Sequence, residues 1–197
     1  PTGSGKTRTL YSFLKYLNRE HLNICSIEDP IEIRLPGVNQ VAYHPKAGLD
    51  FGLIIRALLR QDPDVMMIGE IRDRDTAMLA IQAAQTGHLV LSTIHARNAL
   101  GCIERLENLG IERHAIVDNA LFISSQRLIK RIDPSQADGR LAVHEVLEFS
   151  PSICTAIQAS KGMREIEEIA QSEGFKTMQE GVQILAQKGI VKDSYLI

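Results

Sequence analysis

The first seven residues of this chain, PTGSGKT, constrain its fold more than any other stretch. They match most of a phosphate-binding loop, in which glycines let backbone N–H groups surround phosphates, a lysine reaches the terminal phosphates and a hydroxyl ligates Mg²⁺. The full pattern G-x-x-x-x-G-K-[ST] contains one more glycine, so we expect a glycine and a β-strand to precede Pro1. The predicted nucleotide-binding residues are Thr2, Gly3, Ser4, Gly5, Lys6 and Thr7, with Thr7 holding Mg²⁺ through the nucleotide.

Composition is that of a globular protein with no large nucleic-acid surface. Hydrophobic residues make up 44% and charged residues 23%, and no apolar run approaches the roughly 18 to 20 residues that span a bilayer. The net charge of −2 and an aromatic content of 5% argue against a nucleic-acid partner. The cysteines, Cys25, Cys102 and Cys154, are far apart and suggest neither a metal motif nor a disulfide framework, so we expect a cytoplasmic protein.

An acidic turn follows the first predicted strand, at residues 23–27. Glu28 and Asp29 come directly before Pro30, a pattern that is typical of a turn at the end of a strand. One interpretation is a solvated turn; the other places both carboxylates near a nucleotide, where they hold Mg²⁺ waters or orient an attacking water. Because ligands bind at the carboxyl ends of strands in open α/β sheets, the position favours the second.

A second acidic residue ends the apolar run at 65–68. Such a continuous run is typical of a central parallel strand that is covered on both faces. Glu70 follows it and is a candidate to polarise a water against the terminal phosphate. A phosphate-binding loop followed about 60 residues later by such a strand is a much stronger indication than either alone.

Two histidines bound the predicted strand at 88–95. A metal site is disfavoured, because no third ligand stands at a suitable spacing and an extended segment of seven steps separates its ends by more than ~20 Å. We interpret His95, at the carboxyl end, as a polar sensor of the phosphate, with an ordinary strand cap as the alternative.

The remaining periodicities predict helices that alternate with these strands and a small helical region after them. A linker is expected at 133–139, where turn-forming residues cluster. The predicted elements are helices at 8–18, 51–61, 76–85, 98–109, 113–131, 151–161 and from 177 onward, a strand at 140–149, and a hairpin or two short edge strands at 31–42.

Four blocks together resemble the traffic ATPases of type II secretion and type IV pilus assembly. PTGSGKT resembles the Walker A loop of that family, IEDPIE at 27–32 its Asp box, IGEIRD at 68–73 its Walker B block, and TGH at 86–88 through STIH at 92–95 its His box. The blocks stand in the family order, and the resemblance covers essentially the whole chain.

The resemblance implies a RecA-like P-loop NTPase domain at 1–132, α/β with a mostly parallel central sheet. A linker, strand and helical C-terminal subdomain would follow at 133–197. It implies hydrolysis of ATP with Mg²⁺ as cofactor, to power pilin assembly or protein secretion. Glu70 would be the catalytic carboxylate, Glu28 and His95 would assist, and Asp29, Arg72 and His88 are further candidates. The partners implied are a homo-oligomer, namely a hexameric ring, and an inner-membrane platform protein on its cytoplasmic side, with no nucleic acid.

The chain departs from the family pattern after residue 131. The assembly group usually has a four-cysteine zinc loop there, whereas this chain has Ile132-Asp133-Pro134-Ser135, so zinc is not expected. The N-terminal half of the family's motor is also missing from this sequence. Two other functions stay open: a RecA-like nucleic-acid motor, and a non-catalytic module that packs in a ring or docks a partner.

Overall fold

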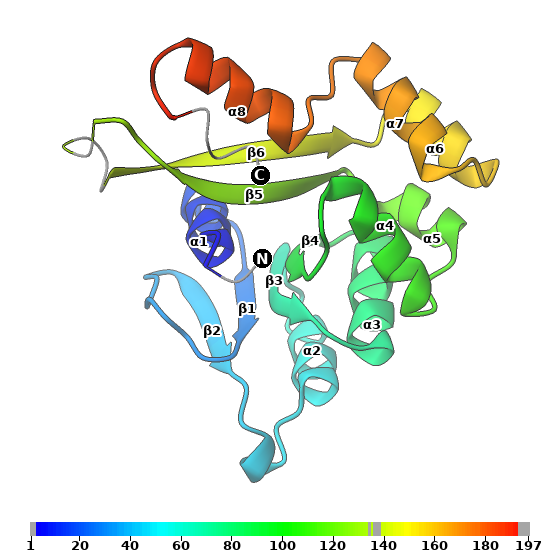
Figure 1. Ribbon diagram of the computed structural model, residues 1–197. Helices are drawn as coiled ribbons and strands as arrows, with labels where there is room; N and C mark the ends of the chain where they lie inside the picture. The colour runs from blue at the N-terminus through cyan, green and yellow to red at the C-terminus, as the bar shows by residue number, and fades with distance from the viewer. Residues whose placement is uncertain (1–2, 134, 136–138, 193–197) are drawn as a thin grey trace. The chain divides into compact units, whose positions relative to one another are not determined.

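The computed structural model describes residues 3–133, 135 and 139–192, which form two compact units (Figure 1). Unit 1 comprises Pro1–Gly5, Ala96–Glu107 and Glu112–Ile197, and unit 2 comprises Lys6–His95 and Asn108–Ile111. Each unit has its own sheet. The division between the units falls within the predicted phosphate-binding loop, after Gly5.

Unit 2 is built on a four-stranded sheet in the order β2-β1-β3-β4, and the strand pairs are all parallel. The central strands β1 and β3 are buried at most positions, as expected for strands covered on both faces. This architecture confirms the predicted α/β fold with a mostly parallel sheet. The strands are β1 (Ile24–Glu28), β2 (Val38–Ala42), β3 (Val65–Ile71) and β4 (Leu89–Ile94).

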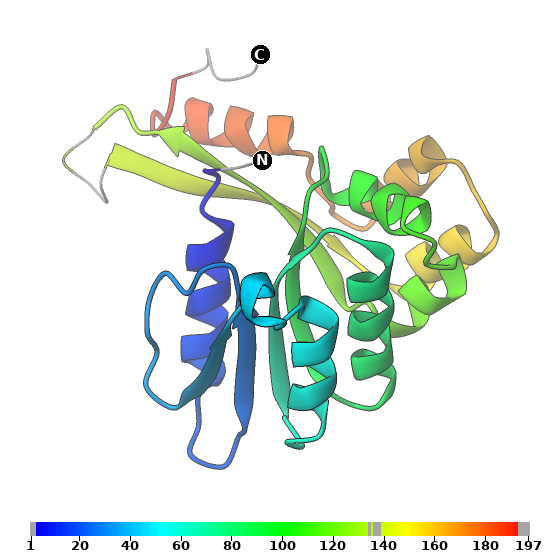
Figure 2. The ribbon, with the colours of Figure 1, turned by 90° about the horizontal axis from the view of Figure 1, so that it is seen from below.

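Helices cover both faces of this sheet, which gives unit 2 two apolar cores. Helix α1 (Lys6–Leu17) packs on one face, where Leu14 meets Ile24 and Met67. Helices α2 (Phe51–Leu59) and α3 (Arg74–Gln85) pack on the other, and a 3₁₀ turn, η1 (Pro45–Ala47), precedes α2. Helix α1 runs opposite to β1 in Figure 2, so its first turn lies at the end of the sheet where β1 finishes.

Side-chain caps define where α2 and α3 begin. Asp50 accepts a hydrogen bond from the N–H of Leu53 at 2.7 Å, and Asp73 accepts one from the N–H of Thr76 at 2.8 Å. Such caps satisfy amides that have no partner within the helix. Asp50 stands directly before the helix expected at 51–61, and its cap fixes the start of that helix.

Among the described residues, unit 1 combines an antiparallel hairpin with five helices. Strands β5 (Phe122–Lys130) and β6 (Arg140–Glu148) pair over nine residues, and one face of the hairpin packs against α8 around Val143 and Val182. The strand expected at 140–149 and the helix expected to start at 151 are confirmed, and the helix expected from 177 onward begins with a capping box between Thr177 and Glu180. The helices are α4 (Ala99–Asn108), α5 (Arg113–Asn119), α6 (Pro151–Gln158), α7 (Met163–Ser172) and α8 (Met178–Gln187).

The single helix predicted at 113–131 is wrong. The segment contains α5, a two-residue break and then β5, which forms every rung of its ladder with β6. Ile116, Ala120 and Ile123 stand four and three apart, and this helical spacing runs from α5 across the break into the start of β5. Long-range pairing with β6 decided the conformation, as no local signal could.

One other expectation differs in detail. The segment 31–42 forms one parallel edge strand, β2, after an irregular loop, and it does not form a hairpin. The domain boundary expected at 132 stays a prediction; residue 132 lies between β5 and β6, and the compact units change along the chain after Gly5, His95, Glu107 and Ile111.

Candidate nucleotide-hydrolysis site

Three neighbouring strands of unit 2 end in polar residues at the same edge of the sheet. Glu28 is the last residue of β1, Glu70 is the last but one of β3, and His95 directly follows β4. The strands are adjacent and parallel, so these positions come together although they are far apart in the sequence. The structure thus brings together the three residues predicted to be catalytic at one end of the sheet.

Glu70 lies between two basic side chains. One carboxylate oxygen, Oε1, is 2.8 Å from Nε2 of His95, and the other, Oε2, accepts a hydrogen bond from Nε of Arg72 at 2.8 Å. The hydrogen bond with Glu70 is the main cause of a raised pKa for Arg72. The Glu70 side chain is 19% exposed, and each carboxylate oxygen can accept a second hydrogen bond, so Glu70 can still receive a water.

Arg72 also reaches the acidic turn after β1. Its Nη1 is 3.4 Å from Oδ2 of Asp29, while its Nε stays on Glu70. One guanidinium therefore bridges the predicted Asp box and Walker B block. Asp29, Arg72, Glu70 and His95 form a continuous row of polar side chains in contact, which we call the acidic row.

An irregularity in the sheet supports Glu70. The pairing of β3 with β4 shifts between Ile68 and Ile71, and the carbonyls there are bound by side chains: Ser92 Oγ donates to Ile68 O and Thr93 Oγ1 donates to Gly69 O, each at 2.7 Å. A bulge of this kind redirects a side chain. Sequence reasoning assigned no role to Ser92 or Thr93, although two hydroxyl residues near the end of a predicted strand were a usable signal.

Gly69 lies where β3 passes close to the backbone of β1. A Cβ on Gly69 would lie 3.1 Å from the carbonyl oxygen of Ile27 and 3.5 Å from the Cα of Glu28. Any larger residue would push β3 away from β1 where the acidic groups meet. Within the predicted Walker B block, Gly69 thus has a steric role and Glu70 a chemical one.

Glu28 has different surroundings from Glu70. It is 3% exposed, and its two oxygens accept hydrogen bonds from Ser26 at 2.6 Å, from Gln40 at 2.9 Å and from the Tyr11 hydroxyl. All three donors belong to unit 2, and none is a basic side chain. The structure therefore brings Glu28 to the edge of the sheet but turns its carboxylate inward.

The phosphate-binding loop shows the backbone conformation that glycines allow. Gly3 and Gly5 have φ angles of 76° and 87°, and the N-terminal turn of α1 starts with Lys6 and Thr7. In unit 1 the carbonyl of Ser4 accepts a hydrogen bond from Gln126 of β5 at 2.8 Å, and a Cβ on Gly5 would lie 2.9 Å from the same Gln126 nitrogen. Gln126 is a supporting residue that sequence reasoning missed. Thr2 lies outside the described residues.

The side chain of Ser4 is a buried hydroxyl without a hydrogen-bond partner among the described residues. Buried polar groups in folded proteins nearly always have a partner. A hydroxyl that lacks one within a loop of this sequence fits a site that receives an anionic ligand.

His88 lies away from the acidic row. It precedes β4, and its Nδ1 is 2.9 Å from both Thr86 Oγ1 and the carbonyl oxygen of Ala83 at the end of α3. The amino end of a parallel strand is opposite to the edge that carries Glu70 and His95. These contacts fit a residue that caps α3 and starts β4.

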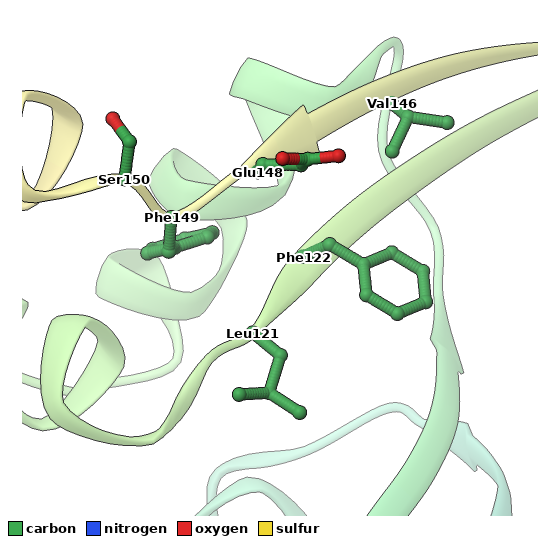
Figure 3. A pocket seen from close by; sticks show the side chains of 6 residues that line it. All are labelled: Leu121, Phe122, Val146, Glu148, Phe149 and Ser150. Atoms are coloured by element: carbon green, nitrogen blue, oxygen red, sulfur yellow. The ribbon is translucent and has the colours of Figure 1, made fainter.

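Among the described residues, no group of three or more His, Cys, Asp and Glu side chains is arranged to hold a metal ion, and no helix is long and apolar enough to cross a membrane. A cavity of about 440 Å³ lies in unit 1, at the end of the hairpin (Figure 3). None of the predicted site residues lines it; its lining consists of Leu121, Phe122, Val146, Glu148, Phe149 and Ser150.

The chain matches a family model and known proteins over most of its length. The family model described as "Type II/IV secretion system protein" matches residues 1–194. The protein transport protein HofB homolog of Escherichia coli K12 is 40% identical over 230 residues, covering 100% of this chain and 50% of the relative. The type II secretion system protein E of Xanthomonas campestris is 37% identical, covering 91% of this chain and 39% of the relative. The chain thus spans about half or less of the length of these relatives.

Solved structures show the same fold. The pilus retraction motor PilT with bound ADP is 30% identical, with a TM-score of 0.86, and the match covers 100% of this chain and 58% of that one. The ATPase DotB of Yersinia pseudotuberculosis is 25% identical, with a TM-score of 0.84, over 99% of this chain and 54% of that one. The predicted RecA-like P-loop fold is confirmed by this likeness. From the match of the family model over residues 1–194, and from the 40% identity to a relative over the whole chain, it follows that the chain belongs to the family of type II/IV secretion system proteins.

Proposed function

We propose that this chain hydrolyses ATP and so powers the assembly of pilins or pseudopilins, or type II protein secretion. The observation that carries the proposal is the Glu70 carboxylate, which lies between His95 and Arg72 at the carboxyl edge of the sheet, in a chain of this family. The relatives named above are transport, secretion and pilus proteins, and this favours such a motor over a nucleic-acid motor.

Binding of the nucleotide would rest on the start of α1. The amides of its first turn point toward the phosphates, Lys6 neutralises phosphate charge, and the positive φ angles of Gly3 and Gly5 let the backbone curve around the ligand. Thr7 and the carboxylates of the acidic row are oxygen donors of the kind that Mg²⁺ prefers, so the residues fit this ion. When bound, Mg²⁺ neutralises charge on the phosphates.

Glu70 would accept the proton of the attacking water. A carboxylate in this position also orients the water in line with the terminal phosphate. His95 and Arg72 keep the carboxylate in one orientation, and Asp29 keeps Arg72 beside it. These neighbours restrict the rotation of Glu70 and leave it lone pairs for the water.

Two substitutions test these roles. Lys6→Ala is expected to abolish binding of a fluorescent ATP analogue, whereas Lys15→Ala, at the other end of α1, is expected to bind normally. Glu70→Gln is expected to bind ATP but to lower phosphate release by about 10²- to 10⁴-fold. Glu20→Gln, on the surface of unit 2, is the matched control for the lost charge. Normal hydrolysis by Glu70→Gln would refute the assignment.

The assembly that we propose is a hexameric ring, bound to a platform protein at the cytoplasmic side of the inner membrane. The mass of the assembly in solution, measured with and without Mg-ATP, tests the ring. Hydrolysis measured with added single-stranded DNA tests the alternative motor, because DNA-stimulated hydrolysis would favour a nucleic-acid substrate.

A further inference from the structure

Tyr11 connects the phosphate-binding helix to the acidic turn after β1. It lies on α1, five residues after Lys6, and is 5% exposed. Its hydroxyl donates a hydrogen bond to Oε2 of Glu28 and accepts hydrogen bonds from the N–H groups of Glu32 at 3.1 Å and Ile33 at 3.3 Å. One donor and two acceptor sites are all that a tyrosine hydroxyl has, and all of them are used.

The alternation of β1 explains why Glu28 meets this helix. Ile24 packs in the core beneath α1, whereas Cys25 and Ile27 pack on the other face, against α2 and α3. Successive side chains of a strand point to opposite faces, so Ser26 and Glu28 share the α1 face with Ile24. Glu28 is therefore a charged residue in a position that the helix covers.

Gln40 of β2 secures the same segment from the other side. Its Nε2 donates to Oε1 of Glu28 and to the carbonyl of Ile33, each at 2.9 Å, and its Oε1 accepts from the N–H of Leu35 at 2.7 Å. The loop between β1 and β2 has no regular secondary structure of its own. Tyr11 and Gln40 supply side-chain partners for its backbone.

The acidic row begins in this loop. Asp29 directly follows Glu28, and it contacts Arg72, which in turn holds Glu70. We propose that Tyr11 is a positioning residue for hydrolysis: through Glu28 and the backbone at 32–33, it ties the position of Asp29 and Arg72 to that of the phosphate-binding helix. The inference rests on the proposed function, and it gives Glu28 a positioning role in place of contact with water.

The electrostatics of the site agree with this role. Burial, and next the hydrogen bond to Glu28, raise the pKa of Tyr11, so its hydroxyl stays protonated and continues to donate. None of the ion pairs among the described residues includes Glu28, so neutral donors alone hold its carboxylate. A buried carboxylate surrounded in this way is costly to move, which makes it a firm connection.

The test separates positioning from stability. Tyr11→Phe keeps the ring but removes the hydroxyl, and it is expected to lower kcat for ATP about 10- to 100-fold, since small displacements of catalytic groups have effects of that size. KM for ATP is expected to stay within about twofold, because Lys6 and Thr7 are untouched. Rates are compared per folded molecule, at a temperature well below unfolding.

Ser26→Ala and Tyr16→Phe are the controls. Ser26→Ala removes another hydrogen bond to Glu28, but Ser26 lies on β1 and does not connect to α1 or to the loop, so kcat is expected to change little. Tyr16 is 73% exposed on the same helix, and its substitution is expected to have no effect. If Tyr11→Phe does not fold, Gln40→Leu frees the same loop from the other side and is expected to lower kcat in the same way.

The outcomes distinguish this inference from the proposed function. An unmodified protein that does not hydrolyse ATP refutes the proposed function. An active protein whose Tyr11→Phe variant keeps full kcat, or whose Ser26→Ala variant loses as much, refutes the positioning role. In a double-mutant cycle, Tyr11→Phe with Glu28→Gln is expected to lower kcat less than the product of the single effects, because both break one connection.

Discussion

Replacing Glu145 by glutamine is expected to destabilise unit 1 strongly. Glu145 lies on β6 and is 3% exposed. One oxygen accepts a hydrogen bond from the N–H of Ala99 at 2.7 Å, and the other accepts one from the N–H of Met178 at 2.9 Å. These residues are the first of α4 and of α8, so one carboxylate joins the N-termini of two helices whose starts are 79 positions apart in numbering.

The size of the effect follows from what glutamine can and cannot do here. The carbonyl oxygen of glutamine can accept a hydrogen bond from the N–H of only one of the two helices. Its NH₂ group then faces the N–H of the other helix, and that N–H has no acceptor. An unsatisfied buried amide costs about 1–3 kcal/mol, and a charged hydrogen bond is worth about 1.5–3 kcal/mol. The lost interaction of a negative charge with two helix N-termini adds about 0.3–1 kcal/mol each. We expect a loss of about 2–4 kcal/mol, because these contributions overlap.

Thermal and urea unfolding, followed by circular dichroism, measure this loss. For a chain of this size, about 2–4 °C of melting temperature corresponds to each kcal/mol, so Glu145→Gln is expected to melt roughly 4 to 16 °C lower. Glu148→Gln is the matched control, since Glu148 lies three residues further along β6, is exposed and loses the same charge. Equal melting temperatures for the two variants would show that the carboxylate does not hold the helices.

Three further changes test other parts of the structure. Gly69→Ala is expected to lower hydrolysis about tenfold or more with little loss of nucleotide binding, because its Cβ would lie 3.1 Å from Ile27 O and displace the strand that carries the catalytic carboxylate; unchanged kcat would contradict this. Thr177→Ala breaks the capping box of α8 and is expected to cost about 1 kcal/mol in urea unfolding; a loss below ~0.3 kcal/mol would argue against the cap. Burial, and next the charge of a nearby glutamate, raise the pKa of the Cys102 thiol to about 11, so at pH 8 iodoacetamide is expected to label the half-buried Cys154 well before Cys102; mass spectrometry of the labelled peptides that finds equal rates would refute this.

Local signals were sufficient for much of unit 2. The glycines and Lys6 of the first loop, the apolar run before Glu70 and the N-cap at Asp50 each depend on a few neighbouring residues. Parallel strands bring their carboxyl ends to one edge, so Glu70 and His95 could be expected there before any contact was known. In the structure, Oε1 of Glu70 lies 2.8 Å from Nε2 of His95, in agreement with that expectation.

In unit 1, the sequence alone did not predict several features that depend on partners far away along the chain. The segment that forms β5 has apolar residues at both helical and strand intervals, and only the ladder with β6 selects the strand. Gln126, which holds the carbonyl of Ser4 from 122 positions away, carries no local signal of that role. The same holds for Glu145, a charged residue in an alternating strand that could equally have faced solvent.

The acidic turn at Glu28 and Asp29 shows most clearly what the sequence determines and what the tertiary structure decides. By itself the sequence determines that two carboxylates end a strand beside a nucleotide motif, because turn chemistry and strand direction are local properties. Only the tertiary structure decides that Glu28 turns inward to Tyr11 while Asp29 joins Arg72, since that depends on which face of β1 the helix α1 covers. Packing across the sheet thereby separates two adjacent acidic residues into a buried support and a member of the acidic row.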